Sequence, residues 1–127
     1  MAKENDFMGW LGKLLHRGKP GLVEGRHFTE HVEQVKELKH QNRHSEAIEL
    51  LLKLVAATES ESKESERASG VAPWYYEQLA IVYRKEKRYA DELAILERYE
   101  NQPKAPGTGP EKLAKRLKQA RARQSRG

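Results

Sequence analysis

Two pairs of histidines have a spacing that could bind a metal ion. His27 and His31 stand four positions apart, as do His40 and His44, and two histidines at this spacing on a helix can share one metal ion. Neither pair is joined by a third ligand at a fixed spacing, and the glutamate of a zinc-protease signature is missing. We therefore interpret them as surface or helix-end histidines, and the sequence predicts no metal site and no cofactor.

Patterns for phosphate and nucleophilic chemistry are incomplete as well. Residues 106–112 have the glycines of a phosphate-binding loop but lack its Gly-Lys-Ser/Thr ending and a preceding strand. The chain contains no cysteine, which excludes a thiol nucleophile, a disulfide scaffold and a cysteine-ligated metal. No serine stands in a nucleophile elbow, and no histidine accompanies a carboxylate at an informative spacing. We expect no enzyme activity.

The positive charge is concentrated at the C-terminal end. The 127 residues contain 24 Lys and Arg against 19 Asp and Glu, which gives a net charge of +5. Residues 101–127 hold eight basic side chains and a single acidic one, Glu111. One interpretation is a polar helix that caps the fold. The other is a nonspecific phosphate-binding strip for nucleic acid within residues 112–126, made of Lys112, Lys115, Arg116, Lys118, Arg121, Arg123 and Arg126.

Length and hydropathy indicate a cytoplasmic protein with one main domain. No uncharged run approaches the roughly 18–20 apolar residues that a membrane span needs. Glu4 and Asp6 stand where a secretory signal would be basic, and Lys13 interrupts its apolar stretch. The composition divides the chain into an N-terminal segment (1–20), a helical domain (21–102) and a linker with a basic C-terminal helix (103–127).

Helix signals recur along the chain, whereas strand signals are nearly absent. No segment alternates over a strand length, and no dipeptide is typical of a hairpin turn. Five helices are expected: residues 28–40 with Thr29 as N-cap, a second from Glu46 with Ser45 as N-cap, a third from Pro73, a fourth after Lys87-Arg88, and a last one from Pro110. The pattern predicts an all-α fold of antiparallel helical hairpins.

Two segments are ambiguous by sequence. The acidic stretch 58–70 fits either a solvated extension of the second helix that stops at Gly70 or a loop. The last helix carries only a thin apolar stripe, made of Leu113, Leu117 and Ala120. Such a stripe is enough to cover one flank of a helical array.

The N-terminal segment carries large apolar side chains on one face of a predicted helix. They recur at helical spacing, at Phe7, Trp10, Leu11, Leu14 and Leu15. Three readings are open: the segment packs on the protein's own helices, docks on a partner, or lies on a membrane surface.

A repeated pattern links the two central hairpins. The second copy reads Tyr76-x-x-Leu79-Ala80-x-x-Tyr83, followed by Tyr89, Leu96 and Tyr99. In the first copy Val35 and Leu38 match Ala80 and Tyr83, His44 matches Tyr89, and Ala47 is the small residue of the second helix, a position that Glu92 fills in the second copy. The pattern resembles a tetratricopeptide repeat, although its offset of 45 residues exceeds the usual length of about 34.

This resemblance implies two degenerate repeats, a C-terminal capping helix and a peptide-binding groove on the first helix of each repeat. The family's groove positions fall on Val32, Glu33, Lys36, Lys39 and His40 in the first copy, and on Glu77, Gln78, Ile81, Arg84 and Lys85 in the second. The resemblance therefore implies a non-catalytic adaptor that binds a protein or an acidic peptide.

Two other functional classes compete with this interpretation. One is a nucleic-acid-associated accessory protein that binds phosphates through residues 112–126, and its binding would fall steeply with salt. The other is a structural homo-oligomer in which stacking between chains replaces the missing repeats.

Overall fold

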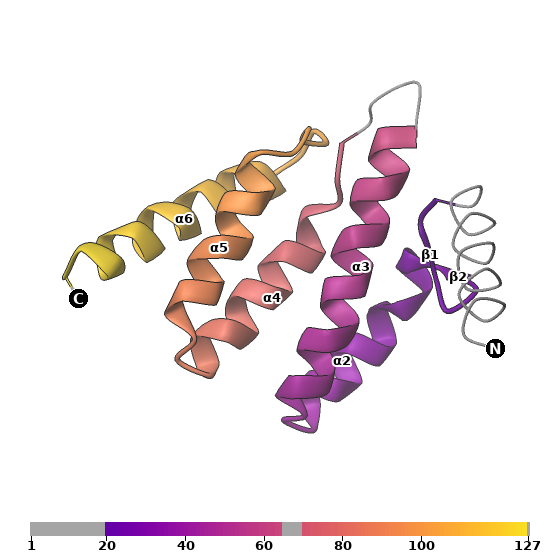
Figure 1. Ribbon diagram of the computed structural model, residues 1–127, viewed down its shortest axis with the longest axis horizontal. Coiled ribbons are helices and arrows are strands. Elements are labelled where there is room, and N and C mark those ends of the chain that lie inside the picture. Colours follow the sequence, from indigo (N-terminus) through magenta and orange to yellow (C-terminus); the bar gives the residue numbers. More distant parts are fainter. Residues whose placement is uncertain (1–19, 65–69, 127) are drawn as a thin grey trace, which may run out of the picture.

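The computed structural model describes residues 20–64 and 70–126, and this part of the chain is built from helices (Figure 1). Its five α-helices are α2 (Val32–His40), α3 (His44–Glu64), α4 (Pro73–Lys85), α5 (Tyr89–Glu100) and α6 (Gly109–Arg126). A two-stranded antiparallel hairpin, β1 (Leu22–Val23) and β2 (Arg26–His27), and the 3-10 turn η1 (Phe28–His31) precede α2. The predicted all-α fold is confirmed.

The α2–α3 and α4–α5 hairpins turn in the same way. Asn42 follows α2 and Lys87 follows α4, and both have a φ of 58° in the left-handed region. In each turn the next backbone N–H donates to a carbonyl of the last helical turn, from Arg43 to Leu38 at 2.9 Å and from Arg88 to Tyr83 at 2.8 Å. These are the bonds of a Schellman motif, which satisfies the final carbonyls of a helix and reverses the chain.

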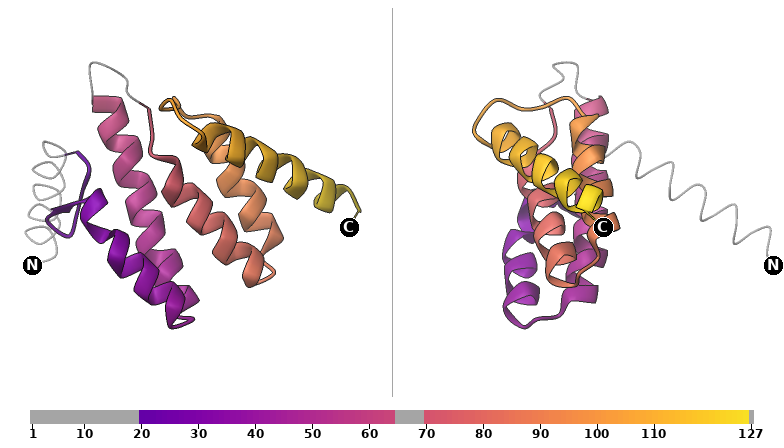
Figure 2. Two further views of the ribbon diagram at one scale, coloured as in Figure 1. Left: turned by 180° about the vertical axis from the view of Figure 1, so that it is seen from behind. Right: turned by 90° about the vertical axis from the view of Figure 1, so that its left-hand side faces the viewer.

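The helices form two layers (Figure 2). Helices α2, α4 and α6 run in the same general direction in one layer (Figure 2). Their starts lie close together, since the ring of Phe28 before α2 packs on Tyr75 of α4, and Gly109 at the start of α6 lies against Pro73 at the start of α4. Helices α3 and α5 form the second layer, where Arg98 of α5 donates two hydrogen bonds to Glu59 of α3, at 2.8 and 2.7 Å.

Helix α4 is the centre of the core. Tyr76, Leu79 and Ala80 are fully buried between the two layers. The hydroxyl of Tyr76 donates a 2.7 Å hydrogen bond to Glu59, and burial together with this bond raises the pKa of Tyr76. The predicted stripe of the last helix is confirmed, because its three side chains are buried at Leu113, Leu117 and Ala120.

Several local predictions were wrong at the N-terminal end of the described chain. A hairpin turn exists at Glu24-Gly25, where φ values of 52° and 81° match the two-residue turn that follows the twist of paired strands. The strands are two residues each, too short for an alternation signal. His27 rather than Thr29 caps η1, since its backbone and side chain both bond within the turn.

The second helix also differs from its prediction. It begins at His44, one residue before the expected cap Ser45, and its described part ends at Glu64. Residues 65–69 lie outside the described residues. Gly70 begins a short extended stretch in which Val71 pairs with Lys104, the segment that leads to α6. None of the described helices combines the length and apolar character needed to cross a membrane.

Candidate functional site

Three basic side chains from three helices, Lys39, Lys85 and Arg116, lie near enough on the face of the α2/α4/α6 layer to influence one another by charge. Lys39 of α2 reaches α4, where its ammonium donates to the side-chain oxygen of the buried Gln78. Burial lowers the pKa of Lys39, and the positive charges of Lys85 and Arg116 lower it further, while Glu77 opposes them. The positive potential at this point is therefore only partly compensated.

We call this surface the basic face and define it by its side chains: Lys39, Glu77, Gln78, Ile81, Arg84, Lys85, Lys112, Arg116, Gln119, Arg123 and Arg126. Of the groove positions expected from sequence, Lys39, Gln78 and Lys85 come together at its centre, and Arg84 lies towards the C-terminal end of α4. Lys36 lies 3.5 Å from Glu33 in an exposed ion pair on α2 itself, and His40 is exposed at the last residue of α2.

Helix α6 completes the basic face. Its contributing side chains stand at i, i+4, i+7, i+11 and i+14, which is one stripe of a helix: Lys112, Arg116, Gln119, Arg123 and Arg126. From the sequence, the four basic residues of this stripe are expected to belong to a separate phosphate-binding strip within residues 112–126. Their helical spacing is the signal that could have grouped them. Arg121 points elsewhere, since it pairs with Glu97 and Glu100 of α5 at 3.6 and 3.2 Å.

A cleft lies at the C-terminal end of the basic face, between α4 and α6. Its volume is about 420 Å³, and it is lined by Arg84, Gln119, Ala122, Arg123 and Arg126. Three guanidinium groups thus share one small concave surface. Planar guanidinium forks suit carboxylate and phosphate ligands because each can donate two parallel hydrogen bonds.

A second, smaller cleft lies at the N-terminal end of the same face. Its volume is about 200 Å³, and its lining includes the half-buried Trp74 together with Glu77 and Lys112. An aromatic wall beside charged groups can take an apolar side chain of a bound peptide. The two clefts place the basic centre of the face between them.

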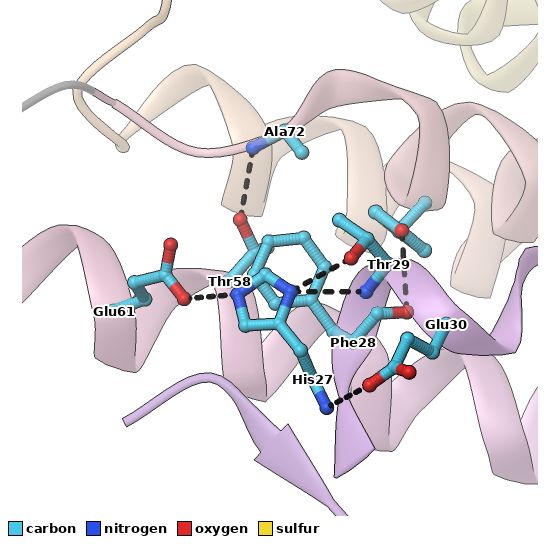
Figure 3. Close-up of polar contacts among 8 residues, drawn as sticks. His27, Phe28, Thr29, Glu30, Thr58, Glu61 and Ala72 are labelled. Atoms are coloured by element: carbon cyan, nitrogen blue, oxygen red, sulfur yellow. Dashed lines mark hydrogen bonds and ion pairs between the residues drawn. The ribbon is translucent and has the colours of Figure 1, made fainter. Parts of the chain in front are cut away.

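The two members of each histidine pair have different surroundings instead of facing a common ligand. The Nε2 atom of His27 contacts Glu61 of α3, and its Nδ1 atom lies 2.8 Å from the hydroxyl of Thr29 (Figure 3). His31 is one of the predicted helix-end histidines, since it ends η1 and precedes α2, but it is fully buried, and its Nε2 donates a 2.9 Å hydrogen bond to the carbonyl of Val23.

The second pair is separated in the same way. His44 lies 3.5 Å from Glu86, in the turn of the next hairpin, while His40 stays exposed. Within residues 20–64 and 70–126, no group of three potential metal ligands comes together. Phe7, Trp10, Leu11 and Leu14 of the predicted docking segment lie outside the described residues.

The arrangement is therefore a surface whose chemistry is positive charge and hydrogen-bond donation. Its residues come from α2, α4 and α6, which the fold holds in parallel. No protein-family model matches this chain, and no curated protein and no solved structure is significantly similar to it.

Proposed function

We propose that this protein is a non-catalytic adaptor that binds an acidic peptide along the basic face, in a groove resembling that of tetratricopeptide repeats. The observation that carries the proposal is the hydrogen bond from Lys39 of α2 to Gln78 of α4, beside which the positive charges of Lys85 and Arg116 lie close enough to lower the pKa of Lys39. Like charges held close together repel one another, and a bound carboxylate relieves that repulsion. Binding of an anionic partner to the basic face is therefore electrostatically favourable.

The equivalence of the two hairpins supports the repeat resemblance. Corresponding turn residues, Asn42 and Lys87, have the same φ and the same pair of reversing hydrogen bonds, and they are offset by the 45 residues that separate the two copies in the sequence. In both copies the first helix lies in the layer that carries the basic face. A repeated hairpin with its first helices in one layer is the geometry that creates an extended peptide site.

The geometry gives less support to the alternative, nucleic-acid binding through residues 112–126. Arg121 and Arg123 are engaged by carboxylates of α5, so two of the seven basic side chains of the predicted strip are already paired. A strip that binds a duplex nonspecifically needs several free cations that follow the phosphates. We therefore rank the peptide above the nucleic acid.

Fluorescence anisotropy with a short, labelled, glutamate-rich peptide tests the proposal on the full chain. The triple variant Lys39→Ala, Lys85→Ala and Arg116→Ala should weaken binding by at least about tenfold, because one charge-assisted hydrogen bond contributes about 1.5–3 kcal/mol. The control variant Lys53→Ala, Lys63→Ala and Lys118→Ala removes the same charge from exposed positions elsewhere.

Three readouts decide the outcome. Binding that survives the first variant, or falls equally in the control, contradicts the proposal. A glutamine-rich peptide that binds as well as the glutamate-rich one contradicts it too. If the chain binds a labelled oligonucleotide more tightly than the peptide, and if the triple variant loses affinity for it to the same extent, the ligand of the basic face is nucleic acid and not a peptide.

A further inference from the structure

The cleft between α4 and α6 contains an arginine that is oriented before any ligand arrives. One terminal nitrogen of Arg123 donates a 2.8 Å hydrogen bond to Glu92, and its guanidinium lies over the ring of Tyr89 at 5.2 Å. Only 2% of Glu92 is exposed. A guanidinium has five N–H donors, so this anchoring leaves donors for the cleft.

Glu92 is an unusual residue for its position. The repeat pattern expects a small side chain there, and a buried carboxylate is costly unless it is paired and hydrogen-bonded. Glu92 meets that condition by holding Arg123, which is itself about one quarter exposed at the cleft. The buried acid thus fixes the direction of an arginine that lines a surface site.

The remaining charges of the cleft are available to a ligand. Arg84 and Arg126 are exposed, and no carboxylate in the described part of the chain pairs with either of them. The side-chain amide of Gln119 adds a hydrogen-bonding group between the arginines. Three arginines and one glutamate leave the cleft with a net charge of about +2.

A phosphate monoester matches this site in charge and in shape. It carries about −1.5 to −2 at neutral pH and presents three acceptor oxygens, which guanidinium forks bind in pairs. A phosphodiester of nucleic acid carries a single charge and leaves one positive charge of the cleft unmatched. A cleft of about 420 Å³ is large enough for a phosphorylated side chain.

We propose that the cleft formed by Arg84, Gln119, Arg123 and Arg126 binds the phosphate group of a phosphorylated side chain. The inference rests on the proposed function, because the cleft is one end of the face on which the acidic peptide lies. It adds a chemical class to the partner, an acidic peptide that carries a phosphomonoester.

The experiment compares two labelled acidic peptides that differ only in a serine or a phosphoserine at the same position. The full chain should bind the phosphoserine peptide at least about tenfold more tightly, since a new charge-assisted contact contributes about that factor or more. Arg84→Ala with Arg126→Ala should reduce this preference to about twofold or less. Both side chains are exposed, so circular dichroism should stay unchanged. Lys63→Ala with Lys118→Ala is the matched control and should keep the preference.

A further variant separates charge from geometry. Arg123→Lys keeps the charge but loses the planar fork, and it should abolish the phosphoserine preference while the weaker binding of the serine peptide persists. Its thermal unfolding is measured in parallel. A preference that survives in an Arg123→Lys protein of unchanged stability contradicts the role of the anchored arginine.

The outcomes distinguish this inference from the proposed function. Equal affinity for both peptides overturns the phosphate site and leaves the acidic-peptide adaptor standing. If the chain binds the phosphoserine peptide but not the serine peptide, and if this binding does not depend on Lys39, Lys85 and Arg116, the proposed adaptor function is contradicted and the phosphate site is supported. Inorganic phosphate that binds as tightly as the phosphoserine peptide overturns the peptide partner, because the peptide then contributes nothing.

Discussion

The substitution Gly70→Ala tests how the two layers are tied together. Gly70 has a φ of +86°, and a Cβ added there would lie 2.3 Å from the backbone nitrogen of Ala105 and 2.5 Å from the carbonyl carbon of Lys104. Both neighbours are backbone atoms, which cannot rotate away as a side chain can. The next residue, Val71, is fully buried, and its N–H donates a 2.9 Å hydrogen bond to the carbonyl of Pro103.

The expected loss of stability has three parts. A left-handed backbone costs alanine about 1–2 kcal/mol. Relief of the overlap between the new Cβ and the backbone of residues 104–105 displaces the backbone at Gly70 by roughly 1 Å. Overpacking of this kind costs about 1–3 kcal/mol. The displacement also weakens the Val71–Pro103 hydrogen bond, which contributes about 1 kcal/mol. We expect Gly70→Ala to lower the free energy of unfolding by about 3–6 kcal/mol in total.

Gly25→Ala provides a matched control. Gly25 has a similar φ of +81°, but a Cβ added there meets nothing within 4 Å. Urea denaturation followed by helical circular dichroism should therefore give a loss of only about 1–2 kcal/mol for this variant. Equal losses for the two variants would refute the reasoning, because the close approach at Gly70 would then contribute nothing.

Three further predictions concern other contacts. Arg123→Ala leaves the buried Glu92 unpaired and should lower the free energy of unfolding, measured by urea denaturation, by about 2–4 kcal/mol. Adding Glu92→Gln to the same chain should recover part of this loss. A double variant no more stable than Arg123→Ala would contradict the pairing. Deletion of residues 104–127 removes α6, whose apolar stripe is buried against the rest of the fold. The helical circular dichroism signal should therefore fall by more than the loss of α6 alone accounts for. A loss confined to the deleted residues would show that α6 is not an integral cap. Trp10→Asp with Leu14→Asp should lower stability or abolish self-association, since burial of each large apolar side chain contributes about 1.5–3 kcal/mol. If the fluorescence of Trp10 is that of a water-exposed indole at every protein concentration, and the variant is as stable as the original chain, docking on an external partner remains as the interpretation.

The sequence alone determined the helices. Pro73 at the first turn of α4, the turn at Lys87-Arg88 and the apolar stripe of α6 were each predicted from signals within a few residues of the feature itself. Local sequence suffices there because helical backbone bonds and side-chain faces repeat every three to four residues. The all-α class and the antiparallel hairpins followed from these signals, and so did the basic character of the first helices.

The tertiary structure alone decided which charged groups meet. Lys39, Lys85 and Arg116 come from three helices, and Glu92 finds Arg123 on the next helix, so no spacing in the sequence relates them. The burial of His31 likewise depends on the carbonyl of Val23 in a hairpin too short to predict. Periodicity says which face of a helix is apolar, but the layer packing sets which polar faces lie side by side. For that reason the sequence presented the basic C-terminal helix as a separate strip, and the packing of α6 beside α4 joined it to the basic face.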